Sequence, residues 1–204
     1  NLLERISLFK KSNMNEIGKF PPYKLFTHFK QMKTQRNALK YYEHKTVSSE
    51  EINSLKSDQN IIIAAHYQPE ATSFPEGGSL YNHIDLVFEL RQKNFQGNIL
   101  YKEHPASKIY YDNYVGPSRV GMYRSIDYYK ELEELGCIFL NTSFELSFDS
   151  DSNWYIPVTM TGSIALERSL FGLPTIVAGM PWYGNIPGSI HISDIDSFNN
   201  FENF

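Results

Sequence analysis

The stretch that decides the fold is residues 60–66, NIIIAAH. Its apolar run, Ile61–Ala65, is short and continuous, which predicts a strand that is covered on both faces of a parallel sheet. Residues 66–79 are polar and contain two prolines and the pair Gly77-Gly78, so we expect a loop there. Helical spacing of apolar residues follows over 80–93. A buried strand that leads through a loop into a helix is the unit of an α/β fold.

The same alternation continues toward the C-terminus. We expect strands at 98–102, 137–140, 154–160 and 174–178, and helices at 80–93, 126–135 and 164–170. Gly136 and Gly172 follow two of the helical segments, where glycine favours helix termination. Pro157 indicates that its strand is irregular. The pattern predicts an α/β, Rossmann-like parallel sheet with helices on both faces.

Charge divides the 204-residue chain into two parts. Residues 1–46 carry 10 Lys or Arg and 3 Asp or Glu, whereas residues 47–204 carry 9 and 20. We therefore expect a basic, helical arm or linker over 1–58 and a Rossmann-like nucleotide-sugar-binding domain over 59–204. Within the arm, helical spacing over 23–44 and a helix start at Ser48 are expected. The acidic body, residues 47–204, does not fit a general nucleic-acid binder, which needs clustered positive charge.

Cysteine and histidine usage excludes several classes of site. Cys137 is the single cysteine, so the sequence has no disulfide framework and no cysteine-based zinc site. It lies in an apolar segment, and we expect a core thiol rather than a nucleophile. The six histidines are scattered and we interpret Asp149-Ser150-Asp151 as a turn, so we expect no metal and no cofactor. No apolar stretch approaches the length of a membrane helix, and no signal peptide is visible.

Polar clusters follow four of the five predicted strands. They are His66-Tyr67-Gln68-Pro69-Glu70, Lys102-Glu103-His104-Pro105, Thr161-Gly162-Ser163 and Gly179-Met180-Pro181-Trp182-Tyr183-Gly184. In an open parallel sheet, ligands bind at the carboxyl ends of the strands. We therefore expect the four clusters to form one site.

The turn Thr161-Gly162-Ser163 suits a phosphate. Glycine permits close backbone approach, and the following helix presents N–H groups and the positive end of its dipole. The alternative is a plain serine N-cap without a ligand. Glu167 lies one helical turn after Ser163, where its carboxylate either accepts hydrogen bonds from ribose hydroxyls or is a solvated surface group.

Candidates for acid–base or nucleophilic chemistry lie in the first two clusters. His104 precedes Pro105, so its backbone is extended and its imidazole could donate to a phosphate or act as a general acid. Glu70 and His66 are the best candidates for acid, base or nucleophile. The alternatives remain open: a hydrogen-bonded structural histidine at 104, and a loop folded by its own prolines around residue 70.

Taken in order, these motifs resemble a known family. The segments 66–72, 102–105 and 161–167, followed by Gly172-Leu173-Pro174, Gly179 and Trp182-Tyr183, are similar to bacterial capsule polysaccharide biosynthesis proteins, which include the Kdo transferases of capsule assembly. The resemblance covers about residues 60–185. It implies the donor-binding, C-terminal half of a GT-B glycosyltransferase, with a CMP-activated sugar such as Kdo as donor.

The resemblance also implies roles for individual residues. His104 and the Thr161–Ser163 turn would hold the donor phosphate, Glu167 would contact the ribose, and Glu70 with Gln68 would face the sugar. Among the same motifs, Lys102, His104, Pro105, Thr161, Gly162, Ser163 and Glu167 are the expected nucleotide-binding residues, Glu70, His66 and His104 the catalytic ones, and Gln68, Trp182 and Tyr183 the substrate-binding ones. GT-B enzymes generally use no metal, because side-chain donors and a helix terminus stabilise the leaving phosphate.

A complete GT-B enzyme has two halves of similar size, and residues 1–58 are too short for the second. We therefore expect an upstream acceptor-binding domain or a partner protein, and a glycan or glycolipid acceptor at the bacterial surface. The expected location is cytoplasmic, with at most peripheral contact with the inner face of the membrane. Three alternatives remain open: a polyol-phosphate transferase of teichoic-acid type, a non-catalytic nucleotide-sugar-binding module, and a flavodoxin-like domain.

Overall fold

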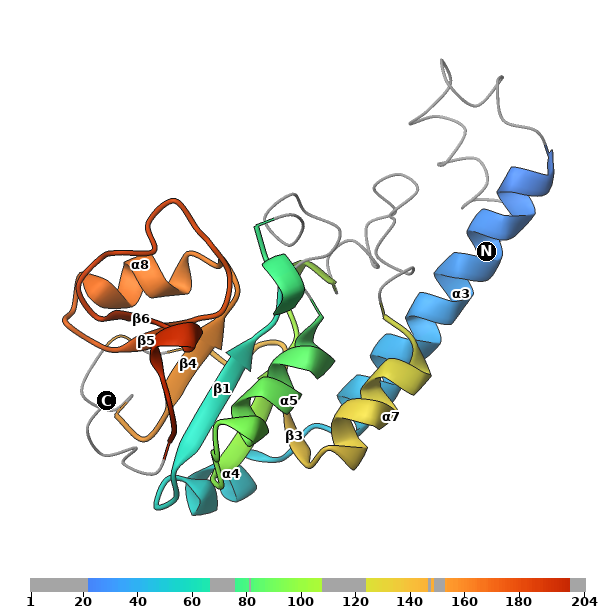
Figure 1. The fold of residues 1–204 in the computed structure, drawn as a ribbon. Coiled ribbons are helices and arrows are strands. Elements are labelled where there is room, and N and C mark those ends of the chain that lie inside the picture. The colour runs from blue at the N-terminus through green and yellow to red at the C-terminus, as the bar shows by residue number, and fades with distance from the viewer. Residues whose placement is uncertain are drawn as a thin grey trace.

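The computed structural model describes residues 22–66, 76–80, 82–107, 124–146, 148 and 153–198. Its centre is a sheet of six parallel strands in the order β3-β2-β1-β4-β5-β6 (Figure 1). The strands are β1 (Asn60–Ala64), β2 (Asn98–Lys102), β3 (Cys137–Leu140), β4 (Ile156–Thr159), β5 (Thr175–Val177) and β6 (Ser189–His191). This is the doubly wound order of Rossmann folds and differs from the flavodoxin-like order. The predicted α/β, Rossmann-like fold is confirmed.

Buried side chains on both faces explain why the strands are apolar throughout. Along each strand successive residues point to opposite faces. One core contains Ile61, Ile63, Ile99, Tyr101 and Phe139, and the other contains Ile62, Leu100 and Leu140. In β1, Ile61 pairs with Ile99 of β2 on one side and with Ile156 of β4 on the other. The fold-deciding strand is therefore central in the sheet.

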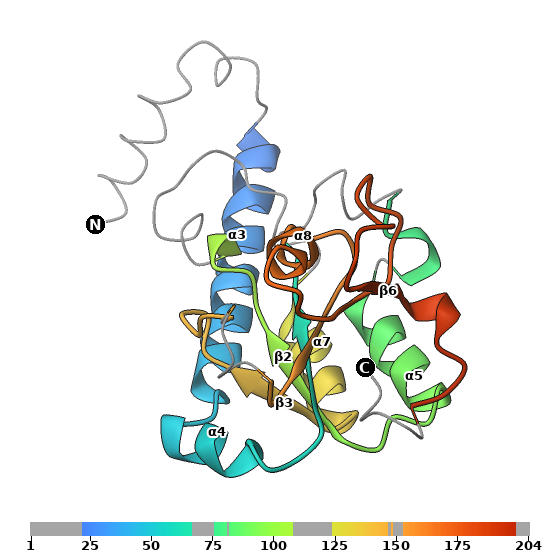
Figure 2. The same cartoon turned by 90° about the vertical axis from the view of Figure 1, so that its left-hand side faces the viewer.

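Helices cover both faces of the sheet. Buried residues of α5 (His83–Gln92), α7 (Ile126–Glu134) and α3 (Pro22–His44) belong to the larger core. On the opposite face lie α4 (Ser49–Leu55) and α8 (Ile164–Ser169), which carry Ile52 and Ala165 into two smaller cores (Figures 1 and 2). Gly136 and Gly172 adopt φ values of 79° and 69° after α7 and α8, as expected for helix-terminating glycines.

The C-terminal half of α3 is part of the body, because Ala38, Leu39 and Tyr42 lie in the same core as β1 and β2. Its N-terminal half projects beyond the sheet (Figures 1 and 2). The predicted helix start at Ser48 is confirmed by a capping box, in which the Ser48 hydroxyl accepts from the Glu51 N–H and the Glu51 carboxylate accepts from the Ser48 N–H. The expected domain boundary at 58–59 stays a prediction.

Several expected bounds shift, and one strand is new. The predicted helix 80–93 is divided into a 3₁₀ turn, η1 (Gly78–Leu80), and α5, whose start is capped by the Asn82 side chain. Pro157 is accommodated in β4 because β5 pairs only from Val158 onward, so this proline has a sheet neighbour on one side. The sequence prediction missed β6 and the 3₁₀ turn η4 (Ile192–Asp194).

Two sequence expectations about apolar segments can be checked against the described residues. Cys137 is buried in β3, and burial raises the pKa of its thiol to about 12, which agrees with the expected core thiol. Among the helices of the described residues, none combines the length and the hydropathy required to cross a bilayer.

Candidate functional site

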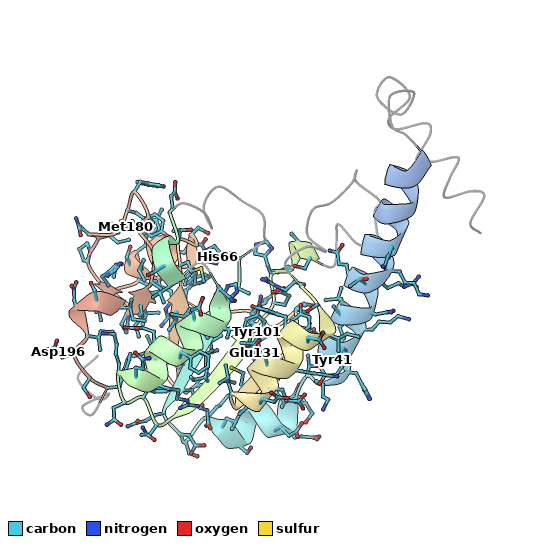
Figure 3. All side chains as sticks on the ribbon, turned by 45° about the vertical axis from the view of Figure 1, so that its right-hand side comes forward. Tyr41, His66, Tyr101, Glu131, Met180 and Asp196 are labelled. Carbon is cyan, nitrogen blue, oxygen red and sulfur yellow. The ribbon has the colours of Figure 1, made fainter. Side chains whose placement is uncertain are left out.

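One pocket of about 600 Å³ opens at the carboxyl edge of the sheet. Ten of its lining residues are those expected from the sequence: His66, Lys102, His104, Pro105, Thr161, Gly162, Ser163, Glu167, Trp182 and Tyr183. Gln68 and Glu70 lie outside the described residues. Every expected site residue within the described part therefore lines the same pocket. His66 and Met180 mark this end of the body in Figure 3.

The floor of the pocket lies where the strand order reverses, between β1 and β4. His66 follows β1, and its ring nitrogen Nε2 accepts from the Thr161 N–H after β4 at 3.0 Å. The same nitrogen lies 3.2 Å from the Thr161 hydroxyl. His66 thus ties together the two strand ends that flank the topological switch point, where ligands bind in open α/β sheets.

A chain of buried hydrogen bonds holds His66 from behind. The backbone N–H of His66 donates to Nε2 of His83 at 3.4 Å, and Nδ1 of His83 lies 3.0 Å from the Tyr128 hydroxyl. Burial, together with the positive charge of Arg124, lowers the pKa of His66 to about 4. The ring is therefore neutral near pH 7 and acts as an acceptor at Nε2. Its expected role in acid–base or nucleophilic catalysis stays a prediction.

Lys102 is the cation of the pocket. It is the last residue of β2 and only 8% exposed, yet none of the ion pairs among the described residues involves its ammonium group. Burial lowers the pKa of Lys102, and the charge of Glu103 acts in the opposite direction. Its Nζ is not one of the buried polar atoms that lack a partner in the described residues, so this ammonium group is open to the pocket. Such a group in a pocket wall is suited to an anionic ligand.

His104 lies beside Lys102 in the pocket wall. Its Nδ1 accepts from the Ala106 N–H at 3.1 Å, which leaves Nε2 to carry the proton of the neutral ring. The backbone N–H of His104 donates to Glu103 Oε2 at 3.1 Å. The Ala106 N–H therefore orients the imidazole so that Nε2 is its donor nitrogen. A donor is what the expected contact with a phosphate requires.

The turn before α8 differs from the expected serine cap. Ser163 makes no side-chain cap hydrogen bond; instead its hydroxyl donates to Glu167 Oε1 at 2.6 Å. Ser163 is the N-cap residue of α8 but does not cap it through its side chain, and a phosphate at this turn stays a prediction. Because α8 has only six residues, its dipole is a weak source of positive potential. The side chains of the pocket are therefore the stronger candidates for binding an anion.

Gly162 is required by packing within the turn. A Cβ at this position would lie 2.6 Å from the Thr159 hydroxyl oxygen, which also accepts from the Gly162 N–H at 3.0 Å. The sequence argument attributed this glycine to close approach of a ligand. The structure shows that the end of β4 already demands it.

Trp182 and Tyr183 form the side of the pocket that follows β5. The Tyr183 hydroxyl donates to the Gly162 carbonyl, so this residue anchors its loop to the turn before α8. The Trp182 side chain is 87% exposed and contacts the Tyr183 ring edge to face, with ring centroids 5.4 Å apart. Of the two expected substrate-binding residues that the structure describes, Trp182 offers a ring face to a ligand, whereas the hydroxyl of Tyr183 donates to the Gly162 carbonyl.

A buried ion pair beneath the pocket was not predicted. The Glu103 side chain is fully buried, and its Oε1 accepts from Arg124 Nε at 2.5 Å. Tyr101 and Tyr129 donate to the same carboxylate at 3.1 and 3.2 Å. Neither local segment carries a signal for this pairing, because the partners lie 21 positions apart in the sequence. Since Arg124 also donates to the His66 carbonyl at 3.2 Å, this network fixes the two histidine-bearing strand ends.

The described residues contain no group of three or more His, Cys, Asp or Glu that could hold a metal ion. No family model matches the chain, and neither the curated proteins nor the solved structures contain a significant match.

Proposed function

We propose that this chain binds a nucleotide sugar in the pocket at the carboxyl edge of its sheet and is the donor-binding half of a glycosyltransferase. The proposed donor is a CMP-activated sugar such as Kdo, and the proposed acceptor is a capsular or other surface polysaccharide. The observation that carries the proposal is the convergence of ten expected site residues on one pocket at the topological switch point.

Charge supports the placement of the phosphate. Lys102 brings an ammonium group without an ion-pair partner in the described part of the chain, and His104 adds an oriented imidazole. In glycosyl transfer, negative charge grows on the leaving phosphate as the bond to the sugar breaks. Donors already fixed beside this phosphate stabilise that charge without reorganising.

Glu167 supports the placement of the ribose hydroxyls of the donor nucleotide. Its Oε1 accepts from the Ser163 hydroxyl, which holds the carboxylate at the pocket wall. A carboxylate so placed can accept two further hydrogen bonds from a ribose. The exposed ring of Trp182, which lines the same pocket, offers a stacking surface for a sugar. In this proposal the acceptor is presented by an upstream acceptor-binding domain or a partner protein.

Titration calorimetry with CMP, CDP, UDP and GDP tests the proposal. We expect the cytidine nucleotides to bind. His104→Ala and Ser163→Ala should each weaken binding by about 1–3 kcal/mol, the first by loss of a charge-assisted contact and the second by releasing Glu167. Ser57→Ala is a matched control, because this exposed serine lies outside the pocket. Absence of binding for all four nucleotides would refute the proposal.

A further inference from the structure

A second pocket of about 680 Å³ adjoins the first and shares Lys102, Pro105, Leu146, Ile164 and Glu167 with it. Its other lining residues are Phe144, Glu145, Phe148 and Phe171. None of these four belongs to the site expected from the sequence. The two pockets are therefore neighbours, and we call the second one the aromatic pocket.

The aromatic pocket contains a stacked pair of phenylalanines, one of which is exposed. Phe148 and Phe171 stack with ring centroids 5.8 Å apart and an interplanar angle of 25°. Phe171 is nevertheless 63% exposed, so most of its ring surface faces solvent. Apolar ring surface left in water forgoes the free energy that burial would supply. A flat ligand ring placed against this pair would recover it.

Three chemistries meet around the boundary between the two pockets. The ammonium of Lys102 and the carboxylate of Glu167 lie at the shared boundary, and the aromatic pair lies beyond them. In a nucleotide the phosphate and the base are attached to the same ribose, so a phosphate and a ribose at this boundary leave the base within reach of the aromatic pair. We propose, resting on the proposed function, that the aromatic pocket seats the nucleobase of the donor. The sugar then extends the other way, toward Trp182.

Glu145 specifies the kind of base. Its side chain lines the aromatic pocket, where a carboxylate accepts hydrogen bonds and cannot donate them. An exocyclic amino group, as in cytosine, is a matching donor, whereas O4 of uracil would face the carboxylate as a second acceptor. The pocket therefore favours cytosine over uracil.

Calorimetry with CMP, UMP and ribose 5-phosphate tests this placement. We expect CMP to bind the wild-type chain more tightly than both other ligands. Phe171→Ala should weaken CMP binding by at least about fivefold, as expected for a lost base–aromatic stack, and leave ribose 5-phosphate binding unchanged. Leu170→Ala is the matched control, since this neighbour is 79% exposed and lines neither pocket. Glu145→Gln should bring the CMP and UMP affinities closer together.

The outcomes separate the two proposals. If CMP binds and Phe171→Ala removes its advantage over ribose 5-phosphate, the base lies in the aromatic pocket. If CMP binds the wild-type and Phe171→Ala chains equally well, the base lies elsewhere, and only this inference is overturned. If CMP does not bind the wild-type chain at all, the proposed function and the inference fail together.

Discussion

Lys102→Met separates a ligand-binding lysine from a structural one. Methionine keeps the length and much of the apolar volume of the lysine stem but removes the ammonium group. Lys102 is nearly buried at the end of β2, and the described residues supply no ion-pair partner for it. We therefore expect the substitution to weaken ligand binding without lowering stability.

The expected loss of affinity follows from one charged hydrogen bond to phosphate. Such a bond contributes about 1.5–3 kcal/mol, which corresponds to roughly a 10- to 150-fold rise in the Kd for CMP. Stability should change little or increase. Because burial lowers the pKa of Lys102 in the folded chain, the unfolded chain binds more protons between the folded pKa and the ordinary value. At neutral pH the ammonium group therefore costs stability, and this cost fades as the pH rises through that window.

The assay pairs calorimetric titration with CMP and urea unfolding at pH 7, on Lys102→Met and on the control Lys130→Met. Lys130 is exposed on α7 and lies outside both pockets. The control should leave both quantities unchanged. Unchanged CMP affinity combined with a loss of more than about 1 kcal/mol in unfolding free energy would show that Lys102 is structural and refute the reasoning.

Three further predictions concern the scaffold of the site. Arg124→Met should destabilise the chain by about 3–5 kcal/mol in urea unfolding, because it leaves the Glu103 carboxylate buried and unpaired. Adding Glu103→Gln should recover part of this loss. If the effects of the two substitutions simply add, this account is contradicted. Since the pKa of His66 is lowered to about 4 in the folded chain, the unfolding free energy should fall as the pH drops from 6.5 toward 4. His66→Phe should reduce the slope of unfolding free energy against pH by about one proton. An unchanged slope would exclude His66 as its source. Gly162→Ala should cost about 1–3 kcal/mol by contact with the Thr159 hydroxyl, and Thr159→Ala should make the alanine more tolerable; equal stability of Gly162→Ala and wild type would mean that the turn can widen freely.

The fold was predictable because its signals are local. Continuous apolar runs identified β1 and β3, and Gly136 and Gly172 marked two helix ends. The short strand β6 was not predicted because only Ile190 of its three residues is apolar. Its pairing with β5 depends on the completed sheet. Strand order is likewise a tertiary property that no local pattern encodes.

The members of the site were predictable, whereas their contacts were not. Strand ends meet at one edge of a parallel sheet, so polar clusters after strands predict a common pocket. Side-chain partners depend on packing: the Ser163 hydroxyl donates to Glu167 instead of capping α8. The pairing of Glu103 with Arg124 joins residues 21 positions apart and has no signature in either local segment.

The most direct test of the central claim is a crystal structure of the chain with CMP bound. The account predicts phosphate density within hydrogen-bond distance of Lys102 Nζ and His104 Nε2, in the pocket at the carboxyl ends of β1 and β4. A phosphate bound elsewhere on the chain, with this pocket holding only water, would contradict the account.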